Sequence, residues 1–276
     1  MKQDQSKIRV PHLVAKKQHG EKITMLTVYD ATMARLLDLA GMDMLLVGDS
    51  LGTVIMGYEN TLPVTLEAVI HHAKAVTNGA KRALVVVDMP FLTYQASIRE
   101  AVRNARRIVQ EGGAEAVKLE GGIAVAGAVK RLADIGVPVM GHLGLTPQSV
   151  HKLGGFRAVG KTQREAEEIL EGALALEEAG AFAVVLESVP DGVAEEVTTK
   201  LKIPTIGIGS GPHCDGQVLV SYDAFGLFDT FVPRFVKRYA RLGETITAAA
   251  KEYITDVQRG RFPAREHSVR ISAQSR

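Results

Sequence analysis

The sequence predicts an α/β protein of the (β/α)8 TIM-barrel class, a single domain with a C-terminal helical extension. Eight short apolar runs rich in β-branched residues alternate with helical patterns over about 230 residues, the length that such a barrel needs. Polar residues follow nearly every run, as expected where a barrel gathers its strand ends at one mouth. The same alternation could build a doubly wound open sheet, but no GxGxxG pattern follows the first run.

The predicted strands are continuous in hydrophobicity rather than alternating. Such runs are typical of parallel strands that are covered on both faces. The last run is the least clear. In chain order the runs are ITMLTVYD (23–30), MLLVGDS (44–50), ALVVVDMP (83–90), AVKLEGG (116–122), VPVMGHLG (137–144), FAVVLES (182–188), IPTIGIGS (203–210) and GQVLVSYD (216–223).

Helical patterns fill most of the intervals between these runs. The clearest cover residues 65–79 and 164–180, where apolar residues recur at i, i+3 and i+4 and a glycine closes the pattern. Thr65 is suitably placed to cap the first of these helices. A longer helical pattern, FVKRYARLGETITAAAKEYITDVQRG, follows residue 230.

The domain organisation follows from the absence of a Pro- or Ser-rich linker. We expect residues 1–276 to form one domain, with the barrel over about residues 20–230 and C-terminal helices and a tail over 231–276. Residues 234–276 contain ten Lys and Arg against four Asp and Glu. As a hypothesis, this basic segment, including the tail 260–276, meets the acidic surface of a neighbouring subunit.

Composition excludes several classes of protein. The chain is 46% hydrophobic and 23% charged, which is ordinary for a globular protein, and its formal charge of +2 gives no support to nucleic-acid binding. Cys214 is the single cysteine, so an internal disulfide is impossible and a reducing compartment is expected. No apolar run approaches the ~18–20 residues of a membrane span, and the polar N-terminus lacks a signal-peptide core. We therefore expect a cytoplasmic protein.

Carboxylates stand at the ends of three consecutive predicted strands. Asp49, Asp88 and Glu120 end the second, third and fourth runs, and the active site of a barrel lies at these carboxyl ends. Three converging carboxylates without a cation would repel one another. Oxygen ligands without a His or Cys cluster point to Mg²⁺ rather than zinc. The alternative is that each acid caps the helix that follows it.

Two further charged residues point to substrate chemistry. Lys118 lies two positions before Glu120, so both side chains face the same side of one strand, and a buried lysine needs an anion such as a substrate carboxylate. An internal salt bridge to one of the acids is the alternative. Glu187 ends the sixth strand, away from the acid cluster, where a general base is expected; a helix cap is its alternative. His142 at the fifth strand is given a supporting role.

These segments resemble the 3-methyl-2-oxobutanoate hydroxymethyltransferase (ketopantoate hydroxymethyltransferase) family of pantothenate biosynthesis. The resemblance extends in order over nearly the whole chain. It is carried by VGDSLG (47–52), TLPVTLEAVIHHAKAV (61–76), VVVDMPF (85–91), AVKLEGG (116–122), GHLGLTPQSV (141–150), VLESVP (185–190), GIGSGPHCDGQVLV (207–220) and PRFVKRYA (233–240).

The resemblance implies a hydroxymethyl transfer from 5,10-methylenetetrahydrofolate, the co-substrate, to 3-methyl-2-oxobutanoate, giving 2-dehydropantoate. It implies Mg-assisted enolate formation followed by an aldol-type addition, with one Mg²⁺ per subunit. It also implies a homo-decamer. The implied site residues are Asp49, Asp88 and Glu120 for Mg²⁺, Asp49, Ser50, Asp88 and Lys118 for the oxo acid, and Glu187 as the proton acceptor.

Two other functions are compatible with a barrel. A Schiff-base aldolase would use Lys118 as its nucleophile and would need no metal, so it would not require the three carboxylates. A non-catalytic binding or scaffold subunit would be expected to lack acids at its strand ends, whereas this chain has them.

Overall fold

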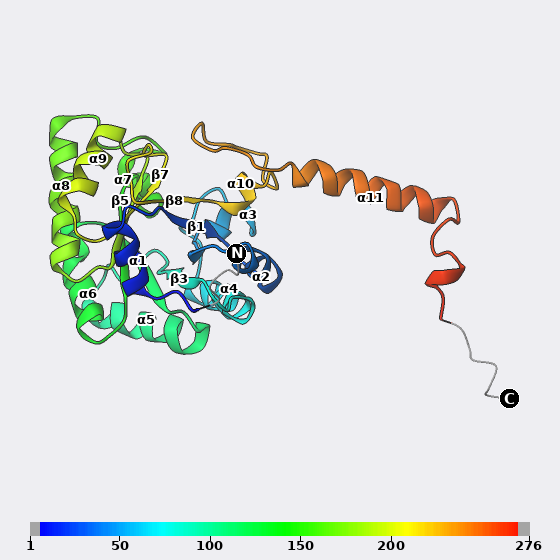
Figure 1. Cartoon of the computed structure of the whole chain (residues 1–276), viewed down its shortest axis with the longest axis horizontal. Helices are drawn as coiled ribbons and strands as arrows, with labels where there is room; N and C mark the ends of the chain where they lie inside the picture. Colours follow the sequence, from blue (N-terminus) through cyan, green and yellow to red (C-terminus); the bar gives the residue numbers. More distant parts are fainter. Residues whose placement is uncertain (1–5, 270–276) are drawn as a thin grey trace. The chain divides into compact units, whose positions relative to one another are not determined.

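A closed barrel is the central element of the structure, a computed structural model that describes residues 6–269 of the 276-residue chain (Figure 1). Within these residues eight parallel strands pair in chain order, and β8 pairs with β1. This closure confirms the predicted class and excludes the open sheet. The strands are β1 Ile23–Thr27, β2 Met44–Val47, β3 Leu84–Asp88, β4 Ala116–Glu120, β5 Val139–Gly144, β6 Ala183–Glu187, β7 Thr205–Ile208 and β8 Gly216–Leu219.

Helices occupy the intervals between the strands from β1 to β7, α1 precedes β1, and α10 and α11 follow β8. Thr65 caps α4 as expected, because its hydroxyl oxygen accepts a hydrogen bond from Ala68 N at 3.2 Å. The helices of more than one turn are α1 Val10–Gln18, α2 Ala31–Leu39, α4 Leu66–Gly79, α5 Ile98–Gly112, α6 Ile123–Asp134, α8 Gln163–Glu178, α9 Asp191–Lys200 and α11 Leu242–Gln258. The short ones are α3 Leu51–Val54, η1 Pro147–Ser149, α7 Val150–Leu153, α10 Ser221–Ala224 and η2 Arg265–His267.

The barrel interior changes from apolar to polar along its axis. On β4, Ala116 belongs to the buried apolar cluster at the amino end, and Lys118 and Glu120 follow on the same side toward the carboxyl end. On β5, Met140 and His142 repeat this order. The polar layer therefore lies at the carboxyl ends of the strands, where a barrel places its active site.

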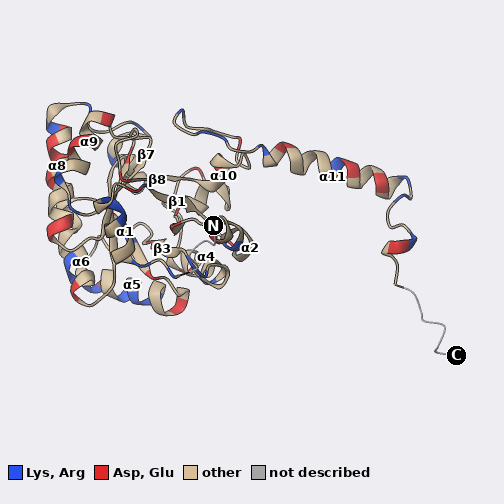
Figure 2. Ribbon diagram, in the orientation of Figure 1, with Lys and Arg blue, Asp and Glu red and all other residues tan. Residues whose placement is uncertain are grey.

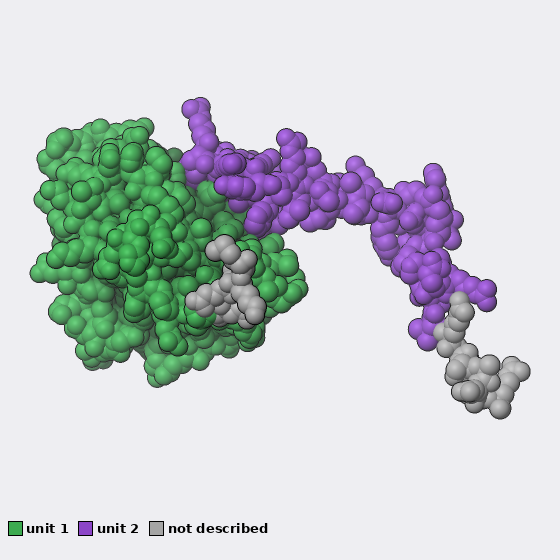
Figure 3. Space-filling model, viewed as in Figure 1, with its two compact units in different colours: residues 1–221 green, residues 222–276 purple. Residues whose placement is uncertain are grey.

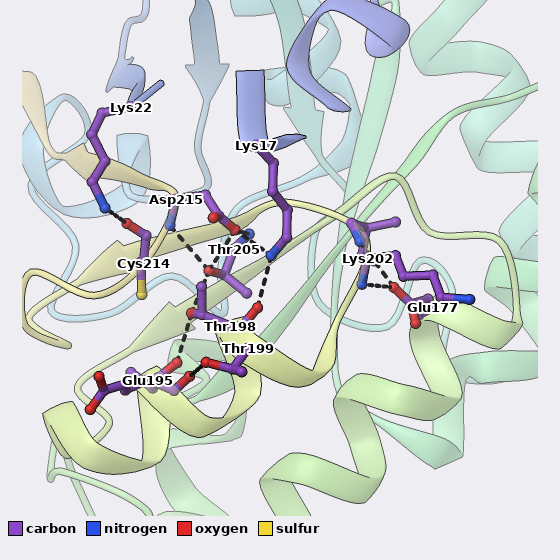
Figure 4. Close-up of polar contacts among 12 residues, drawn as sticks. Lys17, Lys22, Glu177, Glu195, Thr198, Thr199, Lys202, Thr205, Cys214 and Asp215 are labelled. Carbon is purple, nitrogen blue, oxygen red and sulfur yellow. Dashed lines mark hydrogen bonds and ion pairs between the residues drawn. The ribbon is translucent and has the colours of Figure 1, made fainter. Parts of the chain in front are cut away.

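Helix α1 covers the amino end of the barrel. Leu13 is fully buried and belongs to the same apolar cluster as the strand residues. Lys17 Nζ donates 2.7 Å to Asp215 Oδ2 and 2.9 Å to Thr198 O (Figure 4). Asp215 Oδ2 also accepts from Thr205 N at 2.8 Å. These bonds join α1 to α9, β7 and the segment before β8, far from the polar layer.

The chain divides into two compact units, residues 1–221 and 222–276 (Figure 3). The first is the barrel. In the second, α11 has no buried residue, and the Phe262 ring lies between those of Tyr253 and His267 in tilted contacts, with ring centroids 5.7 and 5.0 Å away. The predicted single-domain organisation stays a prediction.

The C-terminal helix is shorter than its sequence pattern. The helical pattern begins at residue 235, whereas α11 begins at Leu242. The preceding residues instead form turns, in which Tyr239 N donates 2.7 Å to Ala224 O and Leu242 N donates 2.9 Å to Phe225 O. Part of the basic tail, residues 270–276, lies outside the described residues.

Surface charges are of both signs on the outer helices, notably on α5 and α8 (Figure 2). Ion pairs four residues apart contribute to this pattern, such as Arg107 with Glu111 at 2.9 Å and Arg164 with Glu168 at 2.9 Å. Among residues 6–269, no helix has the length and apolar character needed to cross a membrane.

Candidate active site

The acids singled out in the sequence come together at the carboxyl end of the barrel. Asp88, Glu120 and Glu187 are the last residues of β3, β4 and β6, and Asp49 lies two residues beyond β2. Asp49, Asp88 and Glu120 are buried, and Glu187 is partly exposed. In the strand register Asp88 pairs with Lys118, so neighbouring strands present these groups at similar heights.

The two aspartates are in direct contact. Asp49 N donates 3.0 Å to Asp88 Oδ2. Burial and then the charges of Asp88 and Glu120 raise the pKa of Asp49 to about 8. Burial also raises the pKa of Asp88, although Lys118 opposes this shift. The structure thus places several carboxyl groups in a buried site where their ionised forms are disfavoured.

Lys118 projects among these acids, as its spacing from Glu120 predicts. Its Nζ lies 2.9 Å from Asp88 Oδ1. The structure therefore contains the internal ion pair, which was the alternative to a substrate carboxylate as the partner of this lysine. Although burial lowers the pKa of Lys118, the charges of Asp88, Glu120 and Asp49 outweigh it and hold that pKa above its ordinary value. A cationic lysine can bind a substrate carboxylate but is a poor nucleophile.

His142 lies between the acid cluster and the proposed base. Its Nδ1 lies 3.1 Å from Lys118 Nζ and 3.4 Å from Glu120 Oε1. Its Nε2 lies 3.1 Å from Glu187 Oε2, a close contact rather than an aligned hydrogen bond. Burial and Lys118 lower the pKa of His142, but the opposite effect of Glu120 and Glu187 is larger, so that the pKa is raised to about 9.

Ser50 lies next to the acids at the start of α3. Its Oγ is 2.9 Å from Tyr29 OH, and this hydroxyl donates 2.8 Å to Thr27 Oγ1. The backbone approaches closely here, because a Cβ on Gly48 would lie only 2.7 Å from Ser50 Oγ. By contrast, Asp30, another acid at a strand end, caps α2 by accepting from Met33 N at 2.8 Å.

Two buried residues of the site were missed by the sequence reasoning. Gln148 follows β5, and Tyr94 lies in the loop after β3. Gln148 Nε2 donates 2.9 Å to Asp49 Oδ2, and Tyr94 OH accepts from Glu120 N at 2.9 Å. The sequence feature that could have identified them is their position after predicted strands, since the segments that follow barrel strands carry functional groups.

The donor set fits a hard divalent cation by its chemistry. It consists of carboxylate oxygens, and Asp88 Oδ1 is buried and accepts no aligned hydrogen bond in the described part of the chain. No group of three His, Cys, Asp or Glu side chains in residues 6–269 already has the arrangement of a metal site. The acids share one neighbourhood but do not yet converge on one point.

Solved structures share this fold at low sequence identity. A putative phosphonomutase from Burkholderia cenocepacia is 14% identical with a TM-score of 0.62, and 90% of this chain aligns with 98% of that one. Phosphonopyruvate hydrolase, solved with oxalate and Mg²⁺, is 12% identical with a TM-score of 0.61 over 94% of this chain and 93% of its own. At this identity the likeness shows the fold alone.

Relatives of known name are far closer in sequence. The 3-methyl-2-oxobutanoate hydroxymethyltransferase of Moorella thermoacetica is 56% identical over 263 residues, covering 95% of this chain and 98% of the relative. That of Syntrophus aciditrophicus is 58% identical over 252 residues, covering 91% and 93%. A sequence model described as ketopantoate hydroxymethyltransferase matches residues 7–265. The chain therefore belongs to the ketopantoate hydroxymethyltransferase family.

Proposed function

We propose that this enzyme transfers the one-carbon unit of 5,10-methylenetetrahydrofolate to C3 of 3-methyl-2-oxobutanoate, giving 2-dehydropantoate and tetrahydrofolate. C3 loses its single proton, forms a bond to the folate methylene carbon, and water supplies the hydroxyl as the methylene leaves the folate. The relatives named above support the overall activity. The roles of individual residues rest on the geometry of the site.

One observation carries the proposal. Three buried carboxylates act electrostatically on one buried ammonium group, which one of them contacts directly, and a fourth carboxylate lies on the other side of His142. An oxo acid offers complementary groups, because its carboxylate can pair with a cation while the proton on C3 faces a base. A binding or scaffold protein has no need to bury so many mutually repelling acids.

Lys118 and Ser50 are suited to hold the carboxylate of the oxo acid. Lys118 is cationic, and its ion pair with Asp88 can open when Asp88 takes another partner. Asp49 and Asp88 line the same side of the site and complete the proposed contacts with the oxo acid.

Glu187 is suited to remove the C3 proton. Its side chain is partly exposed and is separated from the acid cluster by the His142 ring. A carboxylate that does not bind the metal ion is available to accept a proton. After the transfer of the proton, the neighbouring imidazole orients the Glu187 side chain.

Asp49, Asp88 and Glu120 are the residues that would hold Mg²⁺. When bound, the ion would polarise the keto group of the oxo acid and thereby acidify the proton on C3. The protein's part is to hold these acids close together, at a cost from burial and then from electrostatic repulsion, which the raised pKa of Asp49 reflects.

The decisive experiment follows exchange of the C3 proton with deuterated solvent. We expect exchange with Mg²⁺ and none after chelation, and product formation when the folate is added. Exchange at equal rates with and without metal would overturn the assigned chemistry. In the same samples borohydride should trap no adduct on Lys118; a trapped adduct would instead identify a Schiff-base aldolase.

We also propose that the protein self-associates, as a homo-decamer, in the cytoplasm. In support, α11 carries Ile246, Tyr253, Ile254 and Val257 along one face, and none of them is buried. Light scattering on the purified full chain should give a mass of about ten subunits, and Ile254→Glu should reduce it. A wild-type monomer would contradict this proposal without affecting the reaction.

A further inference from the structure

Gln148 uses the full hydrogen-bonding capacity of its side chain inside the site. Its Nε2 donates 2.9 Å to Asp49 Oδ2 and 2.9 Å to Met89 O. Its Oε1 accepts from Tyr94 OH at 2.7 Å and from Gln95 Nε2 at 3.1 Å. A primary amide has two donors and two lone pairs, so no capacity remains. Such a saturated buried side chain has one orientation.

The backbone of the same residue contacts a second acid. Gln148 N donates 2.9 Å to Glu120 Oε2. Gln148 thus contacts Asp49, which follows β2, and Glu120, which ends β4, and it uses one oxygen of each carboxylate. The other oxygen of Glu120, Oε1, lies 3.4 Å from His142 Nδ1.

The Tyr94 hydroxyl determines which way the Gln148 amide points. It accepts from Glu120 N at 2.9 Å, and its oxygen lies closer to Gln148 Oε1, at 2.7 Å, than to Glu120 O, at 3.1 Å, so the better donor contact is to Gln148. With this donor on one side, Gln148 Nε2 faces Asp49. A flipped amide would instead bring Oε1 against the Asp49 carboxylate and the Met89 carbonyl, which are both acceptors.

We propose that Tyr94 and Gln148 are positioning residues that restrict the directions of the Asp49 and Glu120 carboxylates and so favour the binding of a divalent cation between them. This inference rests on the proposed function, because it takes the two acids as cation ligands. Neither residue touches the reacting atoms in this proposal. They act through the two acids, as partners of metal ligands generally do by fixing the direction of each ligand.

The test compares Tyr94→Phe and Gln148→Met with wild type in the full chain. Phenylalanine removes only the hydroxyl, and methionine keeps the length of the side chain without its amide. Thr93→Val is the matched control, because Thr93 Oγ1 donates 2.6 Å to Pro90 O in the same loop without contacting an acid. For each protein we would measure the Mg²⁺ dissociation constant by calorimetry, the melting temperature with and without Mg²⁺, and kcat and KM at several Mg²⁺ concentrations.

We expect Mg²⁺ affinity to fall about 10- to 100-fold in both variants and to stay unchanged in the control. The losses of the two single variants should not add fully in the double variant, because Tyr94 and Gln148 are hydrogen-bonded to each other. Lost kcat should return at saturating Mg²⁺. A lower melting temperature with unchanged Mg²⁺ affinity would overturn the proposal, since only a structural role predicts it.

The outcomes separate this inference from the proposed function. A wild-type protein that binds no Mg²⁺ overturns both. A wild type that binds Mg²⁺ and forms product, together with variants of unchanged affinity, overturns only the positioning role. If Tyr94→Phe does not fold, Gln148→Met decides alone.

Discussion

His142 lies against Glu187, with His142 Nε2 3.1 Å from Glu187 Oε2. The other ring nitrogen, Nδ1, lies 3.4 Å from Glu120 Oε1. The imidazole therefore keeps two carboxylates of different proposed roles apart, the base on one side and a cation ligand on the other. This separation leads to the first prediction.

Glu187→Gln should abolish exchange of the C3 proton while Mg²⁺ and oxo-acid binding persist. The amide keeps the shape of the side chain and its place beside His142 but cannot accept a proton. General-base contributions are typically 10²–10⁴-fold, so kcat should fall by about that factor. Deuterium exchange followed by NMR measures this, and an undiminished exchange rate would contradict the role. Glu195→Gln, an exposed substitution on α9, is the matched control.

Ser210→Ala should lower kcat more than it changes KM. Ser210 Oγ donates 2.7 Å to Leu186 O and accepts from Val189 N at 3.1 Å, so it spans the segment that contains Glu187. Within this segment Ser188 has a φ of 49°, a left-handed conformation that needs outside support. The lost buried bonds should also cost about 1–3 kcal/mol of unfolding free energy. Steady-state kinetics and urea unfolding check both effects; a change in KM alone would contradict the first.

Mg²⁺ affinity should fall as the pH falls below about 8. Burial, Asp88 and Glu120 raise the pKa of Asp49 to about 8 in the metal-free protein, so below that pH the carboxyl group is mostly protonated. An ion that binds the carboxylate must then displace a proton. Calorimetry in two buffers of different ionisation enthalpy should detect proton release at pH 7. Affinity independent of pH between 6 and 8 would contradict this.

Asp49→Asn should stabilise the metal-free protein near neutral pH. The pKa of Asp49 is raised from 3.8 to about 8 on folding, so between these values the unfolded chain carries the charge and the folded chain carries the proton. This group therefore costs stability as the pH rises from about 4 to 8. Asparagine removes the cost. Thermal melts at pH 4 and pH 7.5 should show a gain at the higher pH only, and an equal gain at both would indicate another cause.

Lys17→Met should destabilise the barrel without changing kcat. The side chain joins α1 to Asp215 and to the end of α9 at the amino end of the strands, away from the acids (Figure 4). Its loss removes the ion pair of the Asp215 carboxylate, which keeps its bonds to Thr205, at a cost of about 1–3 kcal/mol. Chemical unfolding measures this cost. A large fall in kcat for the folded variant would show that the two ends of the barrel are coupled.

The sequence alone predicted the barrel because each strand is a short continuous apolar run. Such a run indicates a strand that is buried on both faces, whichever elements cover it. The run 83–90, for example, contains β3 Leu84–Asp88 and extends two residues beyond the end of the strand. The helix cap at Thr65 was also predictable, because it depends only on residues next to it in the sequence. The helical pattern from residue 235 was misleading, because turns within 222–241 replace its first part.

The acids and Lys118 were predictable because strand periodicity fixes the face of each side chain, and parallel strands end together. Two things depended on contacts between distant segments. One was the partner of Lys118, which the tertiary structure shows to be Asp88. The other was the contact of Tyr94 with Gln148, which lie 54 residues apart in different loops. Loop residues have no periodicity that fixes their direction, so only the folded barrel decides which of them meet.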